Sequence, residues 1–104
     1  MIVFTASHSC YANEVLDYLD PDDTLISHRL FREHCYQSTT GTYIKDLRII
    51  DRDLSQLVLI DNAAYSYCLQ LDNGIPILPY YAGQEDCELK TLEQYFMGMI
   101  SKEN

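Results

Sequence analysis

Polar residues that suit phosphate chemistry follow two apolar runs of this sequence. Thr5-Ala6-Ser7 comes directly after Ile2-Val3-Phe4, and Asp61-Asn62 comes directly after Leu57-Val58-Leu59-Ile60. A hydroxyl with neighbouring backbone amides can bind phosphate oxygens, and carboxylate and amide oxygens are ligands that Mg²⁺ prefers. Lys45 could neutralise the charge on a transferring phosphoryl group. Together these residue types predict a phosphate site with an associated magnesium ion.

Each of these residues also has an ordinary structural explanation. Thr5 could be a strand residue that faces the next helix, and Lys45 could be a solvated surface lysine. Asp61-Asn62 could form a turn after a strand, because both residue types favour turns. Which interpretation holds depends on whether the fold brings the three segments together.

The pattern of apolar residues predicts strands and helices in alternation. The predicted strands are Ile2–Phe4, Arg29–Arg32, Leu57–Ile60 and Ile75–Leu78. The predicted helices are Cys10–Leu19 with Ser9 as N-cap, Tyr65–Leu71, and a closing helix from Glu85 onward. The alternation predicts a doubly wound α/β fold, with a mostly parallel sheet and helices on both faces, in one domain of residues 1–104. Such folds bind ligands at the carboxyl ends of their strands, where Thr5 and Asp61 lie.

The closing helix is predicted to be amphipathic. Its apolar stripe is predicted to pack on the core and consists of Leu89, Leu92, Phe96, Met99 and Ile100. Tyr80-Tyr81 precedes this helix near the Asp61 end of the predicted sheet. These tyrosines either form an exposed binding face or pack the core with their hydroxyls in water.

Composition excludes several kinds of partner. The net charge of -9 over 104 residues disfavours nucleic acid and anionic membrane surfaces, since both bind basic surface. The longest apolar runs are too short to span a bilayer, and the N-terminus lacks a basic signal-peptide region. We therefore expect an intracellular chain, nuclear or cytoplasmic.

The four cysteines are widely dispersed, which predicts buried, reduced thiols.

Six ordered sequence blocks carry a resemblance to a known family. They are Val3-Phe4-Thr5-Ala6-Ser7 with Tyr11-Ala12, His28 to Cys35, Tyr43-Ile44-Lys45-Asp46-Leu47, Arg52-Asp53-Leu54, Ile60-Asp61-Asn62, and Asn73-Gly74-Ile75-Pro76-Ile77. Together they resemble the RNA polymerase II C-terminal-domain (CTD) small phosphatases, a branch of the haloacid dehalogenase superfamily. The run from His28 to Cys35 is most similar to the CTD-small-phosphatase-like proteins.

The resemblance implies hydrolysis of phosphoserine or phosphothreonine in a phosphoprotein or phosphopeptide, through an aspartyl-phosphate and with Mg²⁺ as cofactor. It implies that Thr5, with the adjoining Ala6, binds phosphate oxygens and that Arg32 lies near the substrate phosphate. Lys45 would bind both the phosphate and the nucleophile. Asn62 would ligate magnesium, and Asp61 would orient the metal's ligand shell.

The chain departs from the family pattern at its beginning. Family members carry an Asp-x-Asp-x-Thr motif, with the nucleophile and the general acid/base, on a strand that precedes the one starting at Ile2. We therefore expect a C-terminal portion of a phosphatase domain that lacks the central first strand and is inactive alone. Asp46 and Asp51 lie near Lys45 in sequence but are better explained by helix starts and salt bridges. Ala63-Ala64 also replaces the family's usual Ser-Pro.

A missing central strand would leave two unpaired inner edges. Such edges favour a strand-swapped dimer or association with another chain, unless the two inner strands close on each other directly. Two function classes remain open at this point. The chain is a portion of a magnesium-dependent protein phosphatase, or it is a noncatalytic interaction module, a pseudophosphatase, on the same fold.

Overall fold

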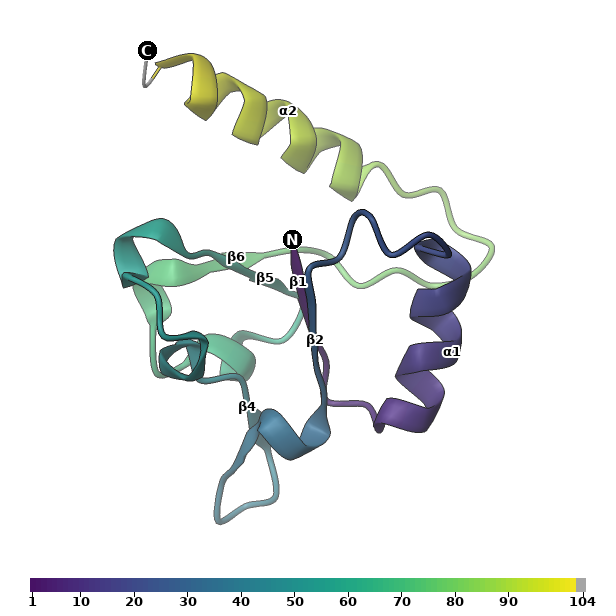
Figure 1. Cartoon of the computed structure of the whole chain (residues 1–104). Coiled ribbons are helices and arrows are strands. Elements are labelled where there is room, and N and C mark those ends of the chain that lie inside the picture. The colour runs from purple at the N-terminus through teal and green to yellow at the C-terminus, as the bar shows by residue number, and fades with distance from the viewer. Residues whose placement is uncertain (103–104) are drawn as a thin grey trace.

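The computed structural model describes residues 1–102 and shows short strands, two α-helices and several 3₁₀ turns (Figure 1). The strands are β1 (Ile2–Phe4), β2 (His28–Leu30), β3 (Tyr36–Gln37), β4 (Tyr43–Ile44), β5 (Leu59–Asp61) and β6 (Gly74–Pro76). The α-helices are α1 (Ser9–Leu19) and α2 (Glu88–Lys102). The 3₁₀ segments are Arg32–His34, Leu47–Ile50, Leu54–Gln56, Ala64–Tyr67 and Leu71–Asn73.

The strands form separate pairs. β1 and β2 are parallel, β5 and β6 are parallel, and β3 and β4 form an antiparallel hairpin. Within residues 1–102 the two parallel pairs share no ladder, so β1 and β5 do not close directly on each other. The parallel pairing and the α/β class are as predicted. Within residues 1–102 the strand pairs do not join into one continuous doubly wound sheet.

Helix α1 is positioned by one apolar face and by a carboxylate at its end. Ala12 and Leu16, four positions apart, are its buried residues. Its N-cap is His8 and not the predicted Ser9, which is the first helical residue. Asp20 follows the helix, is itself buried, and accepts hydrogen bonds from backbone N–H groups of residues 24–26. The hydrogen bond from the Ile26 amide is the main cause that lowers the pKa of this carboxyl.

A small core lies beside β5 and β6. Leu47 is the most deeply buried large side chain and packs with Leu59 and Tyr67. Gly74 begins β6 directly against the Tyr67 ring, where an added Cβ would stand 2.1 Å from Tyr67 Cδ2. The core therefore requires glycine at this position, because no real Cβ contact is that short.

Several predicted elements differ from the observed ones. The predicted strand Arg29–Arg32 is β2 at His28–Leu30, and Leu57–Ile60 is β5 at Leu59–Asp61. The predicted strand Ile75–Leu78 is β6 at Gly74–Pro76. The predicted helix Tyr65–Leu71 is replaced by the 3₁₀ segments Ala64–Tyr67 and Leu71–Asn73.

The prediction that α2 packs on the core was wrong. The helix begins at Glu88 and not at Glu85, and it runs above the strand pairs in Figure 1. Leu89 is 72% exposed, and Met99 and Ile100 are exposed as well. Leu92 and Phe96 are half-buried. An apolar stripe shows which face of a helix avoids water but does not supply the surface that covers it.

The cysteines are unpaired thiols, as predicted, but they are not buried. Cys35 is half-buried and the other three are exposed. In the part of the chain that the structure describes, no helix is long and apolar enough to cross a membrane.

Candidate functional site

Lys45 is held at the end of β4 by the backbone around it. Its amide donates a hydrogen bond of 2.8 Å to the Ser66 carbonyl, which joins β4 to the segment after β5. Ile44 and Leu47 on either side are buried. The side chain of Lys45 is thereby directed to Asp61 Oδ2, with which Nζ forms a hydrogen-bonded ion pair.

Asp61 ends β5 and has both carboxylate oxygens engaged. Oδ2 accepts from Lys45, and Oδ1 accepts from the Ala63 amide at 2.9 Å. The bond to the Ala63 amide forms the turn expected after a strand. Asp61 therefore takes part both in a turn and in an ion pair. The Lys45 and Asp61 side chains are only 11% and 7% exposed. A buried charge needs such a partner, since removing one member leaves the other uncompensated.

A cavity of about 460 Å³ opens beside this ion pair. Four of the predicted site residues line it together: Ala6, Lys45, Asp61 and Asn62. Its rim includes Thr40-Gly41-Thr42, the loop of the β3–β4 hairpin. Sequence reasoning identified this loop only as a turn, although its run of hydroxyl residues was a signal for a polar rim.

Thr5 and Arg32, the other two predicted site residues, do not line this cavity. Thr5 lines a separate hollow beside α1, and its hydroxyl oxygen accepts a hydrogen bond from the Ser7 amide at 3.1 Å. Arg32 Nε donates to the Ala6 carbonyl at 2.6 Å, and its guanidinium lies 4.8 Å from the centroid of the Tyr43 ring. Since Ala6 and Tyr43 both line the cavity, Arg32 is anchored to two parts of its wall.

The charges of Lys45, Arg32 and Asp61 also act on the Cys35 thiol. Burial raises the pKa of Cys35, while the positive charges of Lys45 and Arg32 lower it and Asp61 raises it further. The Sγ atom lies 3.8 Å from the Phe31 carbonyl oxygen and 3.9 Å from the Thr5 carbonyl oxygen, and either can accept from the thiol. A thiol with a raised pKa stays protonated at neutral pH, and the thiolate is the reactive form.

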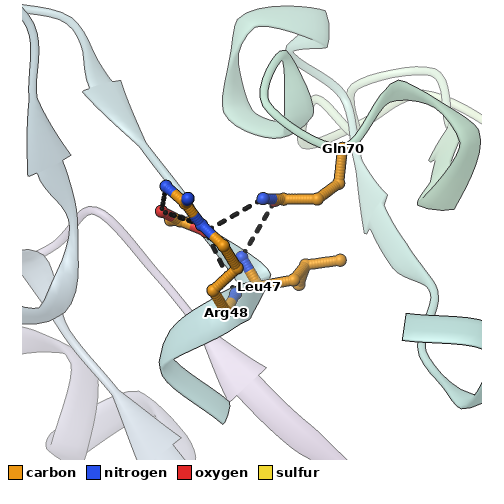
Figure 2. Close-up of polar contacts among 4 residues, drawn as sticks. Leu47, Arg48 and Gln70 are labelled. Carbon is orange, nitrogen blue, oxygen red and sulfur yellow. Dashed lines mark hydrogen bonds and ion pairs between the residues drawn. The ribbon is translucent and has the colours of Figure 1, made fainter. Parts of the chain in front are cut away.

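A polar network fastens the segment that follows Lys45 (Figure 2). Arg48 donates from Nε and Nη2 to the Asp46 carboxylate at 3.0 and 2.7 Å. Gln70 Nε2 donates to the same carboxylate at 2.9 Å, and Gln70 Oε1 accepts from the Leu47 amide at 3.0 Å. The hydrogen bond from Arg48 is the main cause that lowers the pKa of Asp46 to about 2. Gln70 thus links the residues after Lys45 to those after Tyr67.

The oxygen donors at the site are few. Asn62 is exposed and offers an amide oxygen, and Asp61 next to it offers a carboxylate. No group of three or more His, Cys, Asp or Glu side chains able to hold a metal occurs within residues 1–102. Magnesium takes six oxygen ligands and often keeps several waters or substrate oxygens among them. Within these residues a magnesium ion would therefore have the Asn62 amide oxygen and the Asp61 carboxylate, whose oxygens each already accept a hydrogen bond, and would need its other ligands from water and a phosphate.

In this chain a lysine–aspartate pair and an asparagine line an open cavity at the end of β5. Proteins of the α/β class place their binding sites at the carboxyl ends of parallel strands in this way. The family model described as NLI interacting factor-like phosphatase matches residues 1–104. The chain belongs to this phosphatase family.

Individual relatives agree with the family match. The chain is 50% identical over 92 residues to CTD small phosphatase-like protein 3 of Caenorhabditis elegans, covering 88% of the chain and 32% of the relative. It is 40% identical over 104 residues to CTD small phosphatase-like protein 2 of Dictyostelium discoideum, covering all of the chain and 18% of the relative. It is 45% identical over 89 residues to Phosphatase PSR1 of Saccharomyces cerevisiae, covering 86% of the chain and 20% of the relative.

The resemblance to CTD-small-phosphatase-like proteins is confirmed by these matches. The chain spans about a third or less of the length of these relatives.

Proposed function

We propose that this chain supplies the phosphate-binding and magnesium-binding part of a phosphoserine/phosphothreonine protein phosphatase. The observation that carries the proposal is the buried Lys45–Asp61 pair, which faces the same cavity as Asn62 and the Ala6 backbone. A phosphorylated side chain of a protein or peptide would enter this cavity.

The residues that line the cavity have roles that their positions support. The Lys45 ammonium neutralises charge on the phosphoryl group, with Arg32 adding positive charge from the cavity wall. The Ala6 amide binds phosphate oxygens. The Thr5 hydroxyl, which lies outside the cavity lining, is assigned to the same task by the family resemblance alone. Asn62 would ligate the magnesium ion and Asp61 would orient its ligand shell, and the ion would neutralise charge on the phosphate when bound. The ion pair keeps the Lys45 ammonium fixed before substrate arrives, so little reorganisation is needed.

The nucleophile is proposed to come from outside these residues. Asp61 is the one carboxylate among the residues lining the cavity within residues 1–102, and both of its oxygens are engaged. We therefore expect no hydrolysis by this chain alone. The unpaired edges of β1 and β5 support a further strand between the two parallel pairs, which would complete a doubly wound sheet.

Phosphopeptide binding by the purified chain tests this function without requiring turnover. Lys45→Met alone would leave Asp61 buried without a partner, so the informative variant is Lys45→Met with Asp61→Asn. We expect this double variant to bind a fluorescein-labelled phosphoserine peptide at least about tenfold more weakly in fluorescence anisotropy, a loss typical of a charge-assisted contact. Lys90→Met, on the exposed part of α2, is the matched control. Equal affinity for wild type and double variant contradicts the proposed site.

Asn62 allows a separate test of the metal. Its side chain is exposed, so Asn62→Ala should fold like the wild type. We expect the wild-type chain to bind the phosphopeptide more tightly when Mg²⁺ is added, and Asn62→Ala to lose that increase while keeping its magnesium-independent affinity. A variant with an unchanged response to magnesium would show that Asn62 is not a ligand.

The second candidate function is a noncatalytic interaction module, a pseudophosphatase. It is favoured by the open strand edges and by Val58 and Ile60, which are exposed next to or on β5. Pairing of these edges between two copies would give a strand-swapped dimer, which size-exclusion chromatography with light scattering would detect. Hydrolysis of a phosphopeptide by the full-length protein separates the two candidates, since the module would bind without turnover. Either one is expected to work inside the cell, in the nucleus or the cytoplasm.

A further inference from the structure

A second hollow, of about 440 Å³, adjoins the cavity at Lys45 and Asp61. Asn62 lines both of them. The segment after β6 forms one side of the hollow and the beginning of α2 forms the other. The Ile77 amide donates to the Asp61 carbonyl at 3.3 Å, so the wall starts beside the residues of the candidate phosphate site.

Apolar side chains on this hollow are open to solvent. Leu78, Tyr80 and Leu89 line it and are exposed, and Tyr81 beside them is 62% exposed. Contiguous exposed apolar surface with a polar rim marks binding sites, and tyrosine is enriched in them. The sequence allowed Tyr80 and Tyr81 either to form an exposed binding face or to pack in the core. Both side chains are exposed.

Two carboxylates give the hollow a negative wall. Glu88 Oε1 accepts from the Leu78 amide at 2.9 Å, which ties the start of α2 to the segment after β6. Asp86 Oδ1 accepts from the Glu88 amide at 2.8 Å. These bonds fix the positions of both side chains and use one oxygen of each, so their negative charge remains at the wall of the hollow.

We propose that this hollow binds the polypeptide that flanks the phosphorylated residue, and that it selects an apolar side chain together with a lysine or arginine. The inference rests on the proposed function, because the phosphorylated residue must occupy the cavity at Lys45. The two hollows share Asn62, so the selected residues lie close in sequence to the phosphoresidue. Acidic flanks are repelled by Asp86 and Glu88 and by a chain of net charge -9.

A panel of labelled peptides tests the selection by fluorescence anisotropy with the full 104-residue chain. Each peptide contains one phosphoserine, with leucine and arginine placed at successive positions on either side. Matched peptides carry alanine for leucine or glutamate for arginine, and every peptide is also measured without phosphate. At the favoured positions we expect glutamate for arginine to weaken binding about five- to tenfold, and alanine for leucine about threefold or more.

Variants of the hollow connect the selection to its residues. Asp86→Asn with Glu88→Gln keeps both hydrogen-bond acceptors and should reduce the arginine-over-glutamate preference to less than about twofold. A control with the same loss of charge elsewhere, Asp22→Asn with Glu93→Gln, should keep the preference, since both side chains are exposed away from the hollow. Tyr81→Ala should remove the leucine preference, and Tyr81→Phe should retain it.

The outcomes separate this inference from the proposed function. Phosphate-dependent binding with equal affinity for all flanks, or a preference unchanged in the Asp86/Glu88 variant, overturns the flanking site and leaves the proposed function standing. Binding that shows a flank preference but is equally tight with and without phosphate overturns the proposed function and supports the hollow as a peptide site. Binding of none of the peptides overturns both.

Discussion

Gln70 is the residue whose removal should most clearly loosen the support of Lys45. It is a buried side chain that satisfies the amide of Leu47, itself only 2% exposed, and donates to Asp46. Gln70→Ala leaves the buried Leu47 N–H without an acceptor, which costs about 1–3 kcal/mol, and removes a hydrogen bond to a charged group, which contributes about 1.5–3 kcal/mol. Because the two losses overlap, we expect the free energy of unfolding to fall by about 3 kcal/mol.

Urea unfolding followed by far-ultraviolet circular dichroism measures this loss. Gln84→Ala is the control, since Gln84 is exposed and its hydrogen bond to the Tyr81 carbonyl comes from the backbone. Gln70→Glu sharpens the test, because the new carboxylate still accepts from Leu47 but stands beside Asp46 and repels it. A Gln70→Ala chain within about 0.5 kcal/mol of wild type would refute the role assigned to the network.

Two further predictions concern the same region. Gly74→Ala forces a Cβ against the buried Tyr67 ring, so the free energy of unfolding should fall by about 3 kcal/mol in urea, whereas Gly98→Ala, with open space around it, should not destabilise. The pKa of Asp46 falls from 3.8 to about 2 on folding, so its contribution to stability is complete above about pH 4 and lost as the pH falls through 2. The urea midpoint should therefore drop between these pH values in wild type, and the drop should be smaller in Asp46→Asn; equal drops would refute the assignment.

Sequence predicted which polar residues lie together better than it predicted the sheet. Lys45, Asp61 and Asn62 meet at one cavity because β5 ends in polar residues and the backbone of Lys45 pairs with Ser66. Strand propensity is local, however, and cannot tell whether a strand will find a neighbour on each side. The parallel pairs were therefore predictable, whereas sequence left open whether the two inner strands stay apart, as they do within residues 1–102, or close on each other.

Long-range contacts explain the other differences. The predicted helix Tyr65–Leu71 is interrupted at Gln70, where φ is −134° and ψ is 66° and the side chain reaches Leu47. That hydrogen bond joins positions far apart in the chain and leaves no periodic signal. The position of Thr40-Gly41-Thr42 at the cavity rim likewise depends on how the hairpin sits relative to Lys45, which residue types alone do not specify.

The most direct test of the central claim is a ¹⁵N–¹H nuclear magnetic resonance titration of the chain with a phosphoserine peptide and Mg²⁺. We predict phosphate-dependent shifts of the backbone amides of Ala6, Lys45 and Asn62, which line one cavity. The unphosphorylated peptide should leave the amides of Ala6 and Lys45 unchanged. Shifts confined to other surfaces, or identical shifts with the unphosphorylated peptide, would contradict a phosphate site at the Lys45–Asp61 pair.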